Sequence, residues 1–311
     1  MLIDLKPIEG KSTSNCFFFT ISTLLKYYKK ETSLHNACLW NFNFNFNPKL
    51  RVEDCLFEDE LYLECYDFIK QVTGLSLQVI NTKEYRKTVN KFIENKKPVL
   101  VHFDSYYCPW GYNYLKYHYD HFFIITGYDK GNYTCVDSFH LDEVALLSEE
   151  IFDKGIMHVI NHEYENNNMK SVDVIKIVEN KLKENTSMIE ESKMFKDMIA
   201  LSDVILEMDK DKEFEGHNDV KTVPLFTKIQ NIVLNKNALS NVCEELFEKS
   251  GQEYYKEIAK SFFDISQGWN MLLVLLMKFF VTGMNKSRKN SANQLREIVN
   301  KEIEIAKQIN K

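Results

Sequence analysis

Glycine and proline are scarce in this chain, with 10 glycines and 5 prolines among 311 residues. Such a composition argues against a disordered segment, a collagen-like repeat or an all-β fold dense in turns. The length, together with an apolar content of 44%, allows a sizeable core in one or two domains.

A positive net charge is also absent. The formal net charge is −6 at pH 7 and the pI is near 5.8. Proteins that bind a phosphate backbone usually carry a basic surface, and we interpret the basic stretch 286–289 as a solvated helix end. We therefore expect no nucleic-acid partner.

The chain lacks a long uninterrupted apolar run. Its most apolar stretch, 269–281, contains Lys278 and is shorter than the ~20 residues that a membrane-spanning helix needs. The first residues include Asp4 and lack the apolar region of a signal peptide. These features predict a cytoplasmic protein without a membrane partner, in which 269–281 is a buried helix.

Cysteine spacing excludes two further classes. The seven cysteines are odd in number and include no C-x-x-C pair, so neither a disulfide scaffold nor a structural zinc site is expected. We predict free thiols and no bound metal. The question is then which thiol, if any, is a nucleophile.

Several elements can be placed from apolar periodicity. Helical spacing over 14–30, preceded by the N-cap residue types of 12–15, puts Cys16 in the first turn of a helix. Alternating or β-branched runs predict strands, the last two main ones joined by an Asp-Lys-Gly turn into a hairpin. These strands are expected at 75–80, 98–104, 121–128 and 132–136, with further ones at 144–147 and 157–161.

The strand signal stops near residue 165, in the polar stretch 163–168. Beyond it apolar residues recur at the three-to-four spacing of helices. Within the first part, 41–49 alternates Phe and Asn and is read as a strand-like loop. The sequence thus predicts an α+β domain over 1–165 and an all-helical domain over 166–311.

Cys16, His121 and Asp137 have the residue types that a cysteine nucleophile needs. A helix N-terminus favours negative charge, and the thiolate is the attacking form of cysteine. His121 begins a strand that runs into the core, and Asp137 ends the neighbouring strand, where a carboxylate can orient the imidazole. The three converge only if helix 14–30 packs against this sheet.

Other interpretations remain open at this point. Cys16 can instead be a buried structural thiol. His118 is an alternative to His121, and Asp120 and Asp129 are alternatives to Asp137. Cys108, in the aromatic stretch YYCPWGY, can approach the site. The remaining cysteines are predicted to be structural, namely Cys38, Cys55, Cys65, Cys135 and Cys243.

Two segments, NCFFFTISTLLKYY and HFFIITGYDKGNYTCVDSF, resemble the papain-like superfamily, in the form of C39-type bacteriocin-processing peptidases. The run PVLVHFDSYYCPW makes the chain more similar to the N-terminal domain of the butirosin biosynthesis protein H family. The resemblance covers the first half well and the helical half loosely. It implies a papain-like cysteine protease fold, with an N-terminal helix packed on an antiparallel sheet, and a Cys16–His121–Asp137 triad.

The resemblance implies acyl transfer in natural-product (antibiotic, nonribosomal peptide) biosynthesis. An acyl or peptidyl chain would move from a carrier-protein thioester, through acyl-Cys16, to a small amine. The implied partners are an acyl or peptidyl carrier protein and the amine; no cofactor is implied beyond the carrier's phosphopantetheine arm, and a homodimer is compatible. A leader-cleaving papain-like peptidase is the alternative, and an inactive binding module is a third hypothesis.

The chain departs from the peptidase pattern at the oxyanion donor. Papain-like peptidases usually carry a glutamine about six residues before the cysteine, where this chain has Gly10. Lys11 and Asn15, with Ser12 as a further alternative, are the candidates to replace it.

An acid followed by aromatic residues precedes the histidine strand. We predict that this group binds substrate, with Asp104 facing a cationic amine and the rings forming a wall for an acyl chain. The alternative is a strand end whose aromatics cover the core. The predicted substrate residues are Asp104, Tyr106, Tyr107, Trp110 and His118.

Overall fold

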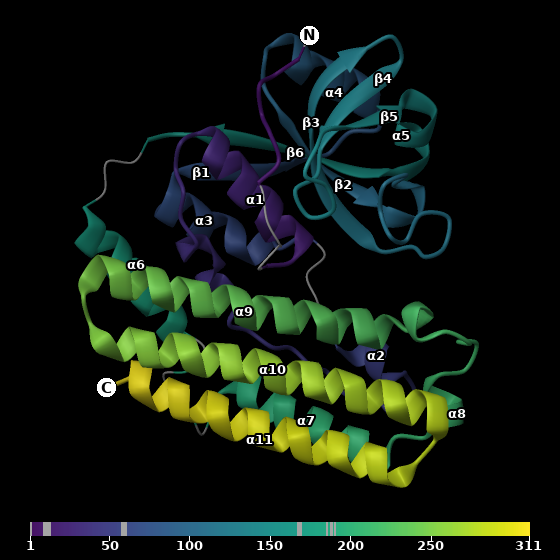
Figure 1. Ribbon diagram of the computed structural model, residues 1–311, viewed down its shortest axis with the longest axis vertical. Coiled ribbons are helices and arrows are strands. Elements are labelled where there is room, and N and C mark those ends of the chain that lie inside the picture. The colour runs from purple at the N-terminus through teal and green to yellow at the C-terminus, as the bar shows by residue number, and fades with distance from the viewer. Residues whose placement is uncertain are drawn as a thin grey trace. The chain divides into compact units, whose positions relative to one another are not determined.

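The computed structural model describes the chain except residues 1, 9–13, 57–60, 167–169, 185, 187, 188 and 190. It has one antiparallel sheet and a helical C-terminal region, which confirms the expected α+β class (Figure 1). The chain divides into two compact units, described here in turn. Unit 1 contains Met1–Thr32 and Glu60–Asn168, and unit 2 contains Ser33–Asp59 and Met169–Lys311.

Unit 1 is built on a six-stranded sheet with the order β1-β6-β2-β3-β4-β5. All neighbouring pairs are antiparallel. The predicted strands are present, although several bounds differ by a few residues. The strands are β1 Leu75–Ile80, β2 Val99–Asp104, β3 Asp120–Asp129, β4 Asn132–Val136, β5 Ala145–Ser148 and β6 Ile156–Tyr164.

The β3–β4 hairpin is fixed by its two-residue turn. Asp129 pairs with Asn132, and the intervening Lys130 and Gly131 both have positive φ, 47° and 80°. Positive φ at both central residues is the type I′ requirement that matches the twist of paired strands. The turn sets the pairing of Gly127 with Thr134, and a register shift between Ile125 and Gly127 then moves the pairing by one residue on the side of His121 and Asp137.

Helix α1, Cys16–Tyr27, packs against β3. Its Phe17 ring lies 5.1 Å, centroid to centroid, from that of Phe122, and Thr20 Oγ1 donates to the Phe122 carbonyl at 3.1 Å. The other helical segments of unit 1 are short. They are η2 Leu63–Cys65, α3 Tyr66–Thr73, α4 Tyr85–Glu94, η3 Ser105–Tyr107 and α5 Glu149–Gly155.

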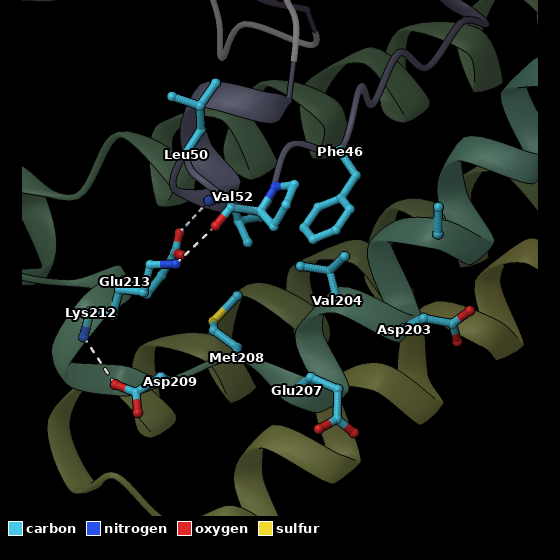
Figure 2. Close-up of a pocket in the computed structure, with 12 residues that line it drawn as sticks. Phe46, Leu50, Val52, Asp203, Val204, Glu207, Met208, Asp209, Lys212 and Glu213 are labelled. Carbon is cyan, nitrogen blue, oxygen red and sulfur yellow. Dashed lines mark hydrogen bonds between the residues drawn. The ribbon is translucent and has the colours of Figure 1, made fainter.

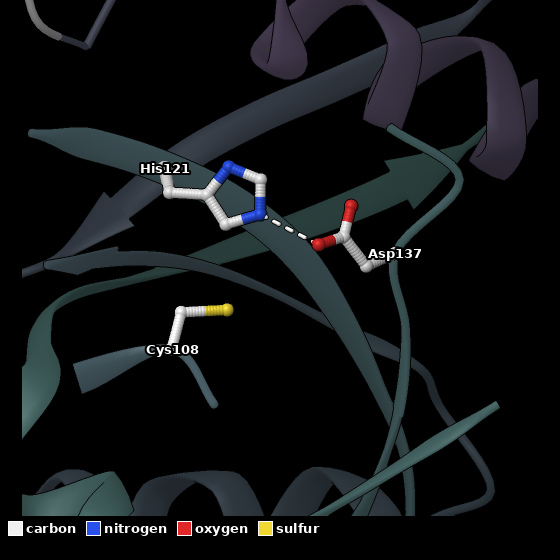
Figure 3. Close-up of side chains that lie close together, drawn as sticks. All are labelled: Cys108, His121 and Asp137. Carbon is white, nitrogen blue, oxygen red and sulfur yellow. Dashed lines mark hydrogen bonds and ion pairs between the residues drawn. The ribbon is translucent and has the colours of Figure 1, made fainter. Parts of the chain in front are cut away.

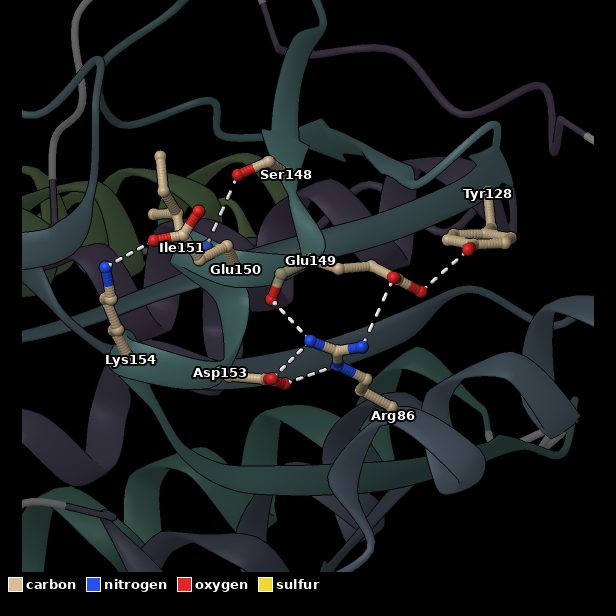
Figure 4. A network of polar contacts seen from close by, with 8 residues as sticks. All are labelled: Arg86, Tyr128, Ser148, Glu149, Glu150, Ile151, Asp153 and Lys154. Atoms are coloured by element: carbon tan, nitrogen blue, oxygen red, sulfur yellow. Dashed lines mark hydrogen bonds and ion pairs between the residues drawn. The ribbon is translucent and has the colours of Figure 1, made fainter.

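A polar network connects α4, α5 and the end of β3 (Figure 4). Arg86 donates to the carboxylates of Glu149 and Asp153. Tyr128 donates to Glu149 Oε1 at 2.6 Å. The Arg86 and Asp153 side chains are more than a third exposed, so we assign these ion pairs a small stability contribution and a mainly orienting role.

The regular elements among the described residues of unit 2 are helices, and an isolated bridge pairs Phe44 with Leu56. Gly251 and Gly283 are the C-caps of α9 and α10, with φ of 70° and 65°. The elements are η1 Leu34–Leu39, α2 Val52–Cys55, α6 Ser171–Glu184, α7 Lys193–Glu207, α8 Lys210–Glu213, η4 Val220–Thr222, α9 Pro224–Ser250, α10 Glu253–Thr282 and α11 Asn285–Ile309.

The grouping of Ser33–Asp59 with the helices is not foreseen by a boundary near residue 165. Every residue of η1 is buried, and Ser33 Oγ donates to Glu245 Oε2 in α9 at 2.7 Å. Short apolar segments carry no sequence mark of the partner that will bury them. As a division into domains, 1–165 and 166–311 stays a prediction.

A buried ion pair lies in the core of unit 2. Lys236 Nζ donates to Glu302 Oε2 at 2.8 Å, and their side chains are 2% and 0% exposed. The indoles of Trp40 and Trp269 also donate to this carboxylate, at 2.9 and 3.4 Å. Because desolvation offsets most of the attraction in a buried pair, the cluster specifies how α9, α10 and α11 align more than it adds stability.

Helix α10 contains the apolar stretch 269–281. By length and composition α10 is the one described helix that could cross a membrane, and half of its most apolar window is buried inside the protein. Trp269 and Leu276 are buried, whereas Met271, Val274 and Val281 are more than half exposed. The stretch is a helix, as predicted, but is buried on one face only.

Gly155, at the end of α5, provides a test of packing beside the site. A Cβ atom there would overlap the ring of Phe103, which is fully buried and pairs in register with His121. We expect Gly155→Ala to lower the free energy of unfolding by about 1–3 kcal/mol through overpacking, measured by denaturant titration. The same change made in a Phe103→Leu background should cost less; an equal cost in both backgrounds would contradict this explanation.

Candidate active site

Cys16 is the first residue of α1. Asn15 precedes it with extended backbone and caps the helix, since its Oδ1 accepts from the Phe18 N–H at 3.2 Å. All seven cysteines are described and are free, and six are buried while Cys16 is partly exposed. The sequence pattern therefore located the one thiol that combines a helix N-terminus with access from outside.

His121 and Asp137 form a buried pair (Figure 3). His121 is the second residue of β3, and Asp137 directly follows β4. His121 Nε2 lies 2.7 Å from Asp137 Oδ2, and the two side chains are 4% and 0% exposed. An imidazole held in this way keeps one tautomer and one orientation.

Cys16 completes a series with this pair. Cys16 lies near enough to the imidazole to contribute to the raised pKa of His121, and its Sγ lies 4.0 Å from the main-chain oxygen of Asp120. Because Nε2 of His121 is paired with Asp137, Nδ1 is the ring nitrogen left for Cys16. The structure thus brings the three predicted side chains together, and their catalytic role stays a prediction.

The electrostatics of the pair favour its charged form. Burial alone lowers the pKa of His121, but the charge and hydrogen bond of Asp137, with those of Cys16, hold that pKa well above its usual value. Burial likewise raises the pKa of Asp137, but the charge and hydrogen bond of His121 outweigh burial, so the pKa of Asp137 lies below its usual value. Both shifts favour the imidazolium–carboxylate form of the pair.

Two more donors hold Asp137. Trp110 Nε1 donates to Oδ2 at 2.7 Å, and the Phe139 N–H donates to Oδ1 at 3.1 Å. The indole of Trp110 thus supports the carboxylate that orients His121, and its predicted contact with substrate stays a prediction. A Trp in an aromatic stretch gives no sequence signal of such a partner.

Cys108 lies on another side of the pair (Figure 3). It is fully buried, and burial raises its pKa to about 11. The nearby imidazole and the N–H groups of Gly111 and Trp110 only partly offset this effect. Cys108 is therefore a neutral packing thiol at neutral pH, in contrast to the accessible Cys16.

Cys108, His121 and Asp137 also offer three metal ligands, with ligand atoms within 4.8 Å of one another. Their types suit zinc, but ligands about 2.0–2.2 Å from a tetrahedral ion lie about 3.3 Å apart. The 2.7 Å separation of His121 Nε2 and Asp137 Oδ2 is shorter and is that of a hydrogen bond. Zinc would have to separate this pair to bind.

Asp104 and His118 lie near the start of the histidine strand. Asp104 pairs in register with Asp120, and its Oδ2 lies 2.6 Å from His118 Nδ1. Its Oδ1 accepts from the Tyr106 N–H at 2.9 Å, and the Tyr106 ring stacks on His118 at 4.3 Å. Asp104 therefore has hydrogen-bond partners on both carboxylate oxygens, and its predicted contact with a cationic amine stays a prediction. Tyr107 packs edge-on against Tyr106.

Of the two predicted oxyanion donors, Asn15 and Lys11, the structure describes only Asn15. Asn15 is 2% exposed, and its Oδ1 is occupied as the N-cap acceptor of α1. Lys11, like Gly10 and Ser12, lies outside the described residues. Helix geometry leaves the N–H groups of the first turn, including those of Cys16 and Phe17, without intrahelical acceptors. These main-chain groups are the better candidates to hold an oxyanion.

Asp120, an alternative to Asp137 in the sequence, pairs with a different histidine. Its Oδ1 lies 2.7 Å from Nε2 of His102, a fully buried residue of β2. His102 Nδ1 lies 3.0 Å from His158 Nδ1, and the two rings are stacked. This chain of polar groups was not predicted, and its one signal in the sequence is a histidine inside the apolar strand PVLVHFD.

Comparison with known proteins adds no relative. A scan against models of protein families finds no match to this chain, and a search of curated proteins finds no similar sequence. The function must therefore be argued from the geometry of the site.

Asp137→Asn tests the electrostatics of the pair. Loss of the carboxylate charge should shift the titration midpoint of His121 to lower pH, because that charge is the strongest influence raising it. The midpoint can be followed by NMR of the imidazole resonances across pH. Asp104→Asn, which removes the carboxylate beside His118, is the matched control and should leave His121 unchanged. An unshifted His121 midpoint in Asp137→Asn would contradict the assignment.

Proposed function

We propose that this protein is a papain-like cysteine acyltransferase. It would move an acyl or peptidyl chain from a carrier-protein thioester, through acyl-Cys16, to a small amine, as in antibiotic biosynthesis. The observation that carries the proposal is the series Cys16–His121–Asp137 at the N-terminus of a helix packed on an antiparallel sheet. The sequence resemblance supplies the donor and acceptor classes.

In the first step the Cys16 thiolate attacks the thioester carbonyl. A carbon–sulfur bond to Cys16 forms, the bond to the phosphopantetheine sulfur breaks, and the departing thiolate takes the proton of His121. The raised pKa of His121 supports this role because it favours the protonated imidazole. In thioester exchange both the attacking and the leaving groups are thiolates, so the reaction needs no acid stronger than the imidazolium of His121.

In the second step the neutral amine attacks acyl-Cys16. The carbon–nitrogen bond forms, the bond to the Cys16 sulfur breaks, and the amine proton passes to His121. The thiolate and imidazolium are thereby restored. In both steps the first-turn N–H groups of α1 would stabilise the oxyanion. Asp137, held by Trp110, keeps the imidazole oriented through the cycle.

Acyl transfer is preferred over peptide cleavage because the chain lacks the usual peptidase oxyanion donor before Cys16. Position 10 is glycine, where peptidases of this superfamily usually have the glutamine that donates to the oxyanion. Hydrolysis of acyl-Cys16 in place of amide formation is the outcome that would favour the peptidase or thioesterase reading.

Acylation of Cys16 tests the proposal directly. Incubation with an acylated carrier protein or an acyl-pantetheine thioester should add one acyl group, seen by intact-protein mass spectrometry. His121→Ala should slow acylation by roughly 10²–10⁴-fold, because the proton donor is lost. A small primary amine should then release the group as an amide.

Cys108→Ala is the matched control, because Cys108 is the second thiol beside His121 and should not be acylated. Adduct formation should vanish in Cys16→Ala and persist in Cys108→Ala. If the adduct is unchanged in Cys16→Ala, the proposal fails.

A further inference from the structure

Unit 2 contains a cavity of about 590 Å³ that the proposed chemistry does not use (Figure 2). One wall is the loop before α2, and the other is formed by α7, α8 and the residues between them. Its size is that of sites for small organic ligands. The lining residues are Phe46, Pro48, Leu50, Val52, Ala200, Asp203, Val204, Glu207, Met208, Asp209, Lys212 and Glu213. We call this cavity the α7 pocket.

The interior of the α7 pocket is apolar. Figure 2 shows the Phe46 ring facing Val204, with Met208 nearby. Met208 is 4% exposed, but Phe46 and Leu50 are 51% and 47% exposed at the loop side. Large apolar side chains that remain exposed around a cavity gain free energy when an apolar body covers them.

The charged groups of the pocket are mostly acidic, with four carboxyl groups against the single ammonium of Lys212. Lys212 Nζ donates to the Pro48 carbonyl at 3.0 Å, and Asp203 is paired with Arg296 at 2.6 Å. Among the described residues Glu207 has no ion-pair partner, and it is exposed. An acidic charge is therefore left uncompensated beside an apolar cavity.

A second carboxyl lies in the pocket wall. Glu213 is 6% exposed and accepts from the Val52 N–H at 2.8 Å. Burial raises its pKa to about 7, and the nearby carboxylate of Glu53 contributes. The charge of Arg51 and the N–H groups of Val52 and Glu53 offset this rise only in part, so a further cation near Glu213 would favour its ionised form.

We propose that the α7 pocket binds a small amphipathic organic cation, a protonated amine carried on an apolar chain or ring. The apolar body would cover Phe46 and Leu50, and the ammonium would lie toward Glu207. A fatty acid or another anion is disfavoured by the same carboxylates. The inference rests on unit 2 alone, so it stands or falls separately from the acyl-transfer proposal.

The test compares three probes that share one apolar body: 4-phenylbutylammonium, 4-phenylbutanol and 4-phenylbutanoate. Binding to the full-length protein is measured by isothermal titration calorimetry at low salt. We expect the ammonium to bind at least about tenfold more tightly than the alcohol, and the carboxylate more weakly than either. Equal affinities, tighter binding of the carboxylate, or no binding of any probe would overturn the proposal.

Variants locate the site. Glu207→Gln should weaken ammonium binding roughly three- to tenfold and leave the alcohol unchanged, because only the charged interaction is lost. Glu297→Gln, which removes an exposed carboxylate on α11 outside the pocket, is the matched control and should change neither. Ala200→Phe should fill the cavity and weaken all probes, with its fold checked by circular dichroism. Unaltered ammonium affinity in Glu207→Gln would contradict the assignment.

Discussion

The hydrogen bond between His121 Nε2 and Asp137 Oδ2 lies in an interior that water hardly reaches. Each charge is tolerated there because the other is present, and either one alone would be an uncompensated buried charge. The pair therefore requires that β3 and β4 keep their register. It also requires Trp110 to remain against the carboxylate, and it leaves Nδ1 of the ring for Cys16.

The parts of the site that the sequence predicted are those with local signals. Asn15 marks the start of α1, so the position of Cys16 at a helix N-terminus follows from one capping residue. The Asp-Lys-Gly turn marks the hairpin, whose two strands carry His121 and Asp137 at neighbouring ends, but the register shift between Ile125 and Gly127 was not predicted. The convergence of Cys16 with them needed the further assumption that α1 packs on β3.

Features that depend on distant partners were not predictable in this way. Trp110 and His102 give no sign in the sequence of the carboxylates that they contact, Asp137 and Asp120. Segment 33–59 is composed like a loop of the first half, yet it packs with the helices. The α7 pocket was missed for the same reason, since its two walls are far apart in sequence.

The interleaving of the two units has a consequence for biosynthesis on the ribosome. The chain passes from one unit to the other three times, near residues 32, 59 and 168. Trp40 leaves the ribosome early, but Glu302, which accepts its indole N–H, is among the last residues made. A nascent chain halted at residue 165 would thus hold the sheet and Cys16, yet expose the apolar side chains of 34–44 to aggregation.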